Sequence, residues 1–113
     1  MRVENRTKAV LLGDAIDVAD TSSKRRRGLL KHAGLAKGQG IWIVPCEAVH
    51  TFGMKFAIDV LFLNKKRKVL KIRADMGRWG IALCFRAHSV LELPAGTIAA
   101  TGTQRGDELE LIK

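Results

Sequence analysis

The chain has 113 residues, and 47% of them are hydrophobic, which excludes a disordered polar chain and leaves enough apolar material for a buried core. Lysine and arginine number 20 against 11 aspartates and glutamates, so the formal net charge is +9, which favours nucleic acid, acidic membranes or phosphorylated ligands as partners. No apolar stretch approaches the roughly 20 residues that span a bilayer. None has the length of a signal-peptide core, about 7–15 residues, so we expect a cytoplasmic protein, or an exported one whose signal has been removed.

In chain order, the expected elements of the first half are strands over residues 10–12 and 15–18, a helix over 24–32, and strands over 40–44 and 49–56. Gly13-Asp14 lies between the first two strands and is typical of a hairpin turn. The helix follows several N-cap residues and is expected to stop near Gly34. Pro45 ends the strand that precedes it, and Gly53 indicates a bulge or a close approach in the next one.

The expected elements of the second half are strands over residues 58–63, 69–73, 89–93 and 108–111, and a helix over 95–101. The first two strands form the clearest hairpin, across residues 64–68. Residues 75–86 have no regular pattern, and the helix lies between Pro94 and Gly102. About eight short strands and two short helices predict an α+β fold: a single compact β-rich domain over residues 1–113, with a mainly antiparallel sheet curled toward a small barrel.

Five motifs occur in order along the chain: Asp20-Thr21 with Arg25 and Arg27-Gly28-Leu29-Leu30, then Phe52-Gly53-Met54-Lys55, Ile58–Leu63, residues 90–96 (Val-Leu-Glu-Leu-Pro-Ala-Gly) and Gly106-Asp107. Together they resemble the domain of unknown function 192 family, from about residue 17 to residue 111. The resemblance implies a compact β-rich domain of bacteria and archaea. It implies no activity, because the family is named for having none assigned.

The sequence departs from the commonest pattern of that family in three places. Gly53 replaces the usual Trp, and Phe56-Ala57 replaces a polar Asn-Thr pair, so the role of that polar pair in relatives does not carry over. Arg67 stands where relatives usually have a turn glycine, so we expect a strained hairpin there.

Cys46 with His50, and Cys84 with His88, form two Cys-x-x-x-His pairs, which is a ligand set that zinc accepts. Residues four apart in a strand lie about 13 Å from each other, too far to share a metal unless the chain bends after Pro45. A Cys46–Cys84 disulfide is a second possibility, and partly buried free thiols are the third. We favour free thiols and expect no metal and no cofactor.

Asp59 and Glu92 each interrupt an apolar run. Asp59 must be paired, hydrogen-bonded or protonated, and the structural explanation is favoured over a ligand contact. Glu92 points to the opposite face from Leu91 and Leu93, which fits the solvent face of an outer strand. The two carboxylates also form a candidate acid–base pair whose separation the sequence does not determine.

Two basic runs stand out, residues 24–27 and residues 65–68. The first wraps around its helix, so some arginine borders the core and needs a carboxylate, Asp59 being one option. The second lies at a hairpin tip, where its charges are open to phosphate groups or simply solvated. Because most of the four Phe and two Trp lie in apolar runs, we expect weak, salt-sensitive and sequence-independent binding to nucleic acid.

Two functions remain open after this reading. The favoured one is a non-catalytic binding module with a basic surface at Lys65, Lys66, Arg67 and Lys68, and a pocket for a small or anionic ligand at Phe52, Met54, Lys55, Asp59, Trp79 and Glu92. Trp79 is the better ligand-contact candidate of the two tryptophans, and Trp42 belongs to the core. The alternative is a small metal-dependent or acid–base enzyme that uses Cys46, His50, Asp59 and Glu92. No motif in the chain demands chemistry, so we favour the binding module.

Overall fold

Ten strands and two short helices make up the fold in a computed structural model that describes residues 1–30 and 32–113. The strands are β1 (Arg2–Asn5), β2 (Val10–Gly13), β3 (Ala15–Ala19), β4 (Gln39–Ile43), β5 (Ala48–His50), β6 (Ile58–Leu63), β7 (Val69–Met76), β8 (Ile81–Leu83), β9 (Ser89–Pro94) and β10 (Leu109–Ile112). The helices are α1 (Ser22–Arg27) and α2 (Thr97–Thr101). Neither described helix is long enough to cross a membrane.

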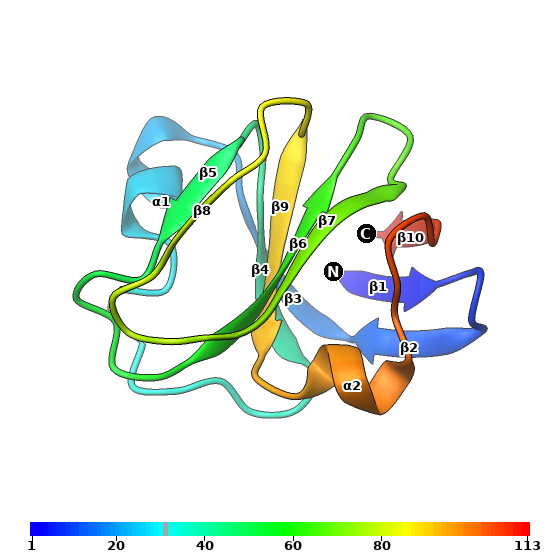
Figure 1. The fold of residues 1–113 in the computed structure, drawn as a ribbon, viewed down its shortest axis with the longest axis horizontal. Helices are drawn as coiled ribbons and strands as arrows, with labels where there is room; N and C mark the ends of the chain where they lie inside the picture. The colour runs from blue at the N-terminus through cyan, green and yellow to red at the C-terminus, as the bar shows by residue number, and fades with distance from the viewer. Residues whose placement is uncertain (31) are drawn as a thin grey trace.

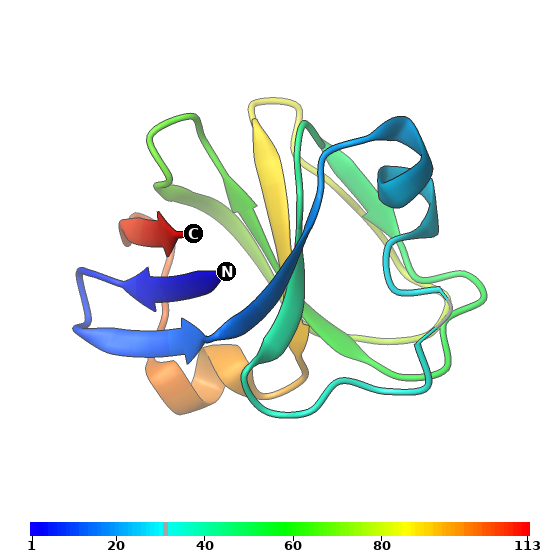
Figure 2. The same cartoon turned by 180° about the vertical axis from the view of Figure 1, so that it is seen from behind.

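A five-stranded sheet runs through the middle of the molecule in the order β3-β4-β9-β6-β7 (Figure 1). Its pairs are antiparallel except for β3 and β4, which are parallel. On one side lies a second sheet in the order β10-β1-β2, and on the other lie α1 and the two-stranded β5-β8 sheet. The view from behind in Figure 2 shows β3 and β4 at the near edge, between the same two coverings.

Both faces of the inner strands β6 and β9 are buried between these layers. Every residue of β6 is buried. Val60 and Phe62 point to the core beneath α1 and the β5-β8 sheet, whereas Leu61 and Leu63 point to the core shared with β1, β2 and β10. A strand covered on both faces is expected to be continuously hydrophobic, so any charged residue in it requires an explanation.

The predicted α+β fold with mainly antiparallel strands is confirmed, but the sheets of the described residues stay open and do not close into a barrel. The predicted hairpin at Gly13-Asp14 is wrong, because β2 pairs with β1 while β3 pairs with β4. The chain crosses between sheets there, and Gly38 O accepts hydrogen bonds from Asp14 N and Ala15 N. A Cβ on Gly13 would lie 2.7 Å from Gly38 O, so the crossing requires glycine.

Helix α1 is shorter than the sequence predicts. The Thr21 hydroxyl caps its start by accepting a hydrogen bond from Lys24 N, and Gly28, with φ of 47°, ends it. The predicted stop at Gly34 is therefore wrong, and Lys31, inside the predicted span, lies outside the described residues. The helix is short because Gly28 adopts a positive φ, which glycine tolerates at a helix end without a steric penalty.

Candidate functional site

Glu92 lies at the centre of the main sheet. Its strand, β9, sits between β4 and β6, and Glu92 is directly opposite Ile41 on one neighbour and Val60 on the other. Its side chain is on the face of Val60, toward α1 and β5, and only 4% of the residue is exposed. The expectation that Glu92 occupies the solvent face of an outer strand is therefore wrong. The alternation of residues in β9 correctly predicts the direction of the Glu92 side chain. It does not predict that another layer of the fold covers that face.

A cavity of about 170 Å³ adjoins Glu92. Its apolar and backbone walls come from Gly28, Leu29, Leu30, Ile43, Ala48, Val49 and Met54, and its polar lining from Arg25, Arg26, Arg27, Cys46, His50 and Glu92. Among residues 1–30 and 32–113 no hydrogen bond or ion pair reaches the Glu92 carboxylate. Burial alone raises its pKa to about 7, because the charged form loses its hydration and gains no counter-charge.

Cys46 lines this cavity from the segment after Pro45. Its thiol donates a hydrogen bond to Ala48 O at 3.1 Å. Burial raises the pKa of the thiol, and the charge of Glu92 adds to that rise against the opposing hydrogen bond to Ala48. Cys46 and Cys84 are both free thiols. Because its pKa is raised, the Cys46 thiol is protonated at neutral pH and is a poor nucleophile or metal ligand.

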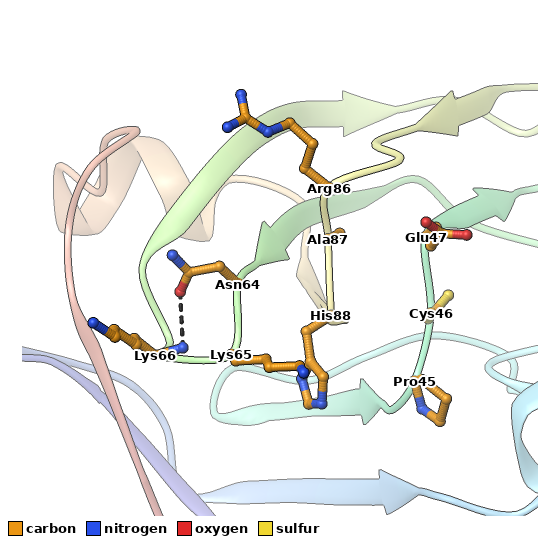
Figure 3. A pocket seen from close by; sticks show the side chains of 9 residues that line it. All are labelled: Pro45, Cys46, Glu47, Asn64, Lys65, Lys66, Arg86, Ala87 and His88. Atoms are coloured by element: carbon orange, nitrogen blue, oxygen red, sulfur yellow. Dashed lines mark hydrogen bonds between the residues drawn. The ribbon is translucent and has the colours of Figure 1, made fainter.

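A second, wider cleft of about 870 Å³ also has Cys46 in its lining (Figure 3). Three segments line it: Pro45, Cys46 and Glu47 after β4; Asn64, Lys65 and Lys66 at the β6–β7 turn; and Arg86, Ala87 and His88 before β9. Backbone hydrogen bonds hold the segments together, from Cys46 N to His88 O at 3.0 Å and from His88 N to Leu63 O at 2.8 Å. Three of the lining residues are Lys or Arg and one, Glu47, is acidic, so we call this the basic cleft.

The turn that carries Lys65 and Lys66 is held by Asn64, whose Oδ1 accepts hydrogen bonds from Lys66 N and Lys68 N, each at 2.9 Å. In Figure 3 Lys65 extends toward the side of the cleft where His88 lies, while Lys66 and Arg86 point outward. His88 Nδ1 is buried and has no hydrogen-bond partner in the described part of the chain. The cleft thus has exposed cationic side chains in its lining, together with a histidine whose buried Nδ1 has no described partner.

Arg67, one of the four residues of the predicted basic surface, serves the fold as well. Its φ is 67°, the left-handed conformation that the missing turn glycine led us to expect. Its guanidinium lies 4.7 Å from the centre of the Trp42 ring, a cation–π contact over a buried tryptophan. Lys65, Lys66 and Lys68 are exposed and remain available to a ligand.

Asp59 lies on the opposite face of the sheet from Glu92, because it is opposite Leu93 in β9 while Glu92 is opposite Val60. Its two oxygens accept hydrogen bonds from Asp75 N at 2.7 Å and Ile98 N at 2.8 Å. The first bond holds a bulge in β7 and the second caps α2. Asp59 and Glu92 therefore do not form the carboxylate pair that the enzyme hypothesis used, and no described ion pair joins Asp59 to an arginine of α1.

The six predicted ligand residues do not share one pocket. Met54 and Glu92 line the Glu92 cavity, and Asp59 is across the sheet. Lys55 is exposed, and Phe52 and Trp79 contact each other on the surface with ring centroids 5.7 Å apart.

Further large apolar side chains are exposed on β8 and just after it. With the aromatic pair, the large exposed apolar side chains of residues 52–85 are Phe52, Trp79, Ile81, Leu83 and Phe85. Trp79 is 78% exposed and Phe85 77%, so neither of these aromatic side chains belongs to the interior. The sequence did signal Trp79, which lies between Arg78 and Gly80 in an irregular segment.

Several lining residues were not predicted. His88 was noted only as the partner of Cys84 in a metal motif, Arg86 only as part of the irregular segment 75–86, and the arginines of α1 only as a basic run. In the described residues no group of three or more His, Cys, Asp or Glu side chains is placed to hold a metal ion. The signal that pointed to the basic cleft was the turn run of lysines, but its partner segment, 20 residues later in the chain, becomes visible only in the fold.

The family model described as DUF192, "Uncharacterized ACR", matches residues 3–111. A UPF0127 protein of Thermococcus sibiricus is 31% identical over 112 residues, covering 94% of this chain and 71% of the relative. A UPF0127 protein of Pyrococcus abyssi is 30% identical over 115 residues, covering 96% and 95%.

Two crystal structures share the fold. A protein of unknown function from Novosphingobium aromaticivorans superposes with a TM-score of 0.86 at 21% identity, covering 98% of this chain and 84% of that one. A candidate transcription regulator from Sinorhizobium meliloti superposes with a TM-score of 0.83 at 23% identity, covering 96% and 89%. At these identities the likeness shows the fold alone.

Proposed function

We propose that this chain, which belongs to the DUF192 family, is a non-catalytic binding module whose basic cleft takes phosphate groups of an anionic ligand. The observation that carries the proposal is that Lys65, Lys66 and Arg86, from two distant segments, all line one cleft of about 870 Å³. That volume is typical of small-ligand sites. Lysine and arginine side chains that surround such a cleft are the usual partners of phosphate oxygens.

Two further features support an anion. The net charge of +9 attracts polyanions to the whole molecule before any contact forms. The buried His88 Nδ1 lacks a partner among the described residues, and a ligand oxygen or a bound water is the kind of group that satisfies it. Phe85 does not line the cleft, but it is exposed and precedes Arg86 in the chain, so it offers a base of an oligonucleotide an aromatic face for stacking.

We expect binding to be weak and independent of sequence. α1 has six residues and carries its arginines around the rim of the Glu92 cavity, so no described helix is built to enter a DNA groove. The alternative, an acid–base enzyme, has less support than the binding module. Asp59 lies on the far side of the sheet from Glu92, and the pKa of the Cys46 thiol is raised.

The test is a fluorescence-anisotropy titration with three unrelated labelled 20-nucleotide single strands and with inorganic polyphosphate. Three phosphate contacts predict that affinity falls by about 20-fold between 50 mM and 200 mM salt. Lys65→Ala, Lys66→Ala and Arg86→Ala combined should weaken binding to every probe by at least tenfold. The matched control combines Lys37→Ala, Lys55→Ala and Lys113→Ala, which removes the same charge outside the cleft.

Equal weakening by the cleft variant and the control would show that net charge, not the cleft, binds the anion. A preference above about a hundredfold for one sequence at physiological salt would replace the proposal with a specific nucleic-acid reader. Tighter binding of the oligonucleotides than of polyphosphate, lost in Phe85→Ala, would assign the stacking contribution to Phe85.

A further inference from the structure

The Glu92 cavity is separate in chemistry from the basic cleft and has no role in the proposed function. A carboxylate in an apolar sheet is costly to bury, and proteins normally offset that cost with hydrogen bonds or a counter-charge. Asp59, in the same sheet, has two backbone N–H donors. Glu92 has none among the described residues, although it is 4% exposed and lines an open cavity.

The size of the cavity restricts what can enter it. Its volume of about 170 Å³ corresponds to about five or six water molecules, at roughly 30 Å³ each. The end of a small molecule fits, but a nucleotide does not. Apolar walls, including Leu29, Val49 and Met54, suit a short hydrocarbon stem.

The charge of the cavity lining changes sign. The buried part carries the Glu92 carboxylate, whereas helix α1 contributes arginines. Arg25, on α1, donates hydrogen bonds to Asp20 O and Ser22 Oγ of its own segment. Arg26 and Arg27 are exposed, and in the described part of the chain neither side chain forms a hydrogen bond or an ion pair. Two arginines whose guanidinium groups have no partner in the described part of the chain therefore line the same cavity as an unpaired carboxylate.

We propose that this cavity binds a small zwitterion, whose ammonium or guanidinium end pairs with the Glu92 carboxylate while its anionic end is held by Arg26 and Arg27. A simple amine would meet the repulsion of the arginines, and a simple carboxylate would gain nothing from Glu92. A molecule with both charges satisfies both, since guanidinium groups bind carboxylates or phosphates in a two-pronged geometry and a buried carboxylate gains most from a paired cation.

The pH dependence of binding follows from the groups that face the cavity. These are Arg25, Arg26 and Arg27 from α1, Cys46 and His50 from the segment around β5, and Glu92 itself. Burial raises the pKa of Glu92 to about 7, so a cation binds the ionised form and displaces a proton. Affinity should rise about tenfold from pH 6 to pH 8, the ratio of ionised fractions for a group of that pKa.

The experiment is isothermal titration calorimetry with the ω-amino acids from 3-aminopropionate to 6-aminohexanoate and with 4-guanidinobutyrate. Valerate and butylamine, each carrying one charge, are the controls for the probes. At least one zwitterion should bind tenfold or more tightly than either control. Titration at pH 7 in buffers of different ionisation enthalpy should show release of about half a proton for each molecule bound.

The variants assign the two ends of the ligand. Glu92→Gln keeps the shape of the side chain and should abolish both the tenfold preference and the proton release. Arg26→Ala combined with Arg27→Ala should weaken the zwitterion to the level of butylamine and leave the pH dependence in place. His50→Gln, the control for the other titratable group, should keep the proton release.

Three results would overturn the proposal: valerate binding as tightly as the best zwitterion, an unchanged affinity in Glu92→Gln, or no probe saturating below 10 mM. If Glu92→Gln fails to fold, the wild-type proton release and the arginine variant still decide. The combined Lys65→Ala and Lys66→Ala variant should bind the zwitterions normally. This variant therefore distinguishes failure of the zwitterion proposal from failure of the proposed anion binding at the basic cleft.

Discussion

Asp59 and Glu92 occupy neighbouring strands of one sheet, yet their environments differ at every point that matters for a carboxylate. Asp59 accepts two backbone N–H groups, so its charge is compensated by the fold itself. Glu92 faces a cavity and relies on protonation or on a ligand. At the scale of single residues, one carboxylate is structural and the other is free to interact.

Asp59→Ala should lower the free energy of unfolding by about 2–4 kcal/mol, because two backbone donors lose their acceptor inside the protein. Asp17→Ala, at an exposed position in β3, is the control and should change stability by less than about 0.5 kcal/mol. Urea denaturation of both variants measures the difference. An Asp59→Ala change as small as that of the control would mean that neither bond stabilises the bulge or α2.

Glu92→Gln should become increasingly stabilising as the pH rises. The pKa of Glu92 is raised from 4.5 to about 7, so the folded state binds more protons than the unfolded state between these values, and wild-type stability falls as pH increases through that window. Gln cannot ionise, so the stability of the variant does not fall with pH in this way. The stability of Glu92→Gln relative to wild type should therefore increase by about 3 kcal/mol between pH 4 and pH 8.

Urea denaturation of wild type and Glu92→Gln across that pH range measures the effect. Glu47→Gln, which changes an exposed glutamate outside the sheet, is the matched control and should show no comparable trend. A constant difference between wild type and Glu92→Gln would mean that Glu92 has the same pKa in the folded and unfolded protein, so that its burial is fully compensated.

At the scale of elements, the outer sheet is joined to the α2–β10 connection by a polar cluster. Asn5 in β1 donates hydrogen bonds to Asp107 Oδ2 at 2.9 Å and to Thr103 Oγ1 at 3.1 Å, and Lys8 pairs with Asp107 at 2.9 Å. Burial alone would raise the pKa of Asp107, but the hydrogen bonds from Asn5, Gln104 and Lys8 outweigh it, and the pKa is lowered. The cluster fixes β1 against the final strand.

Asp107→Asn should destabilise the protein by about 1–3 kcal/mol at pH 7, because the Lys8 pair and a charge-assisted acceptor are lost. Since the folded-state pKa is lowered, the stabilisation by the ionised Asp107 is present above the usual aspartate range and disappears as pH falls below it. The difference between wild type and variant should thus shrink in acid, below about pH 4. A difference that stays constant in acid would show that shape rather than charge is responsible.

The elements also show what local sequence can predict. β6 was predicted with its observed bounds, and the hairpin to β7 was predicted too, because apolar runs flank a polar turn. β8 was missed, since Ile81–Leu83 stabilises a strand only by pairing with β5, a partner more than 30 residues earlier. A hairpin was predicted at Gly13, where the chain passes from one sheet to another. The prediction was wrong because a tight turn alone does not determine which strands pair.

At the scale of the whole molecule, the candidate sites arise from the stacking of layers. The direction of the Glu92 side chain was predictable from alternation, but its burial depends on α1 and β5 covering that face. The lysines of the basic cleft were predicted from their exposed turn, whereas Arg86 and His88 join them through backbone bonds between distant segments. Local patterns therefore identified single residues, and only tertiary packing brought them together.

The position of β9 in the central sheet has a consequence for how the chain reaches its fold. β4 and β6 are both synthesised before β9, but they do not pair with each other, and β9 lies between them. Until residues 89–94 emerge from the ribosome, both neighbours present unpaired edges and apolar faces, which is a state prone to association with other chains. Closing the sheet then requires insertion of a strand between two distant segments, a topology dominated by long-range contacts that folds slowly. A strand at the centre of the finished sheet is thus among the last to be made, and the nascent chain depends on its arrival.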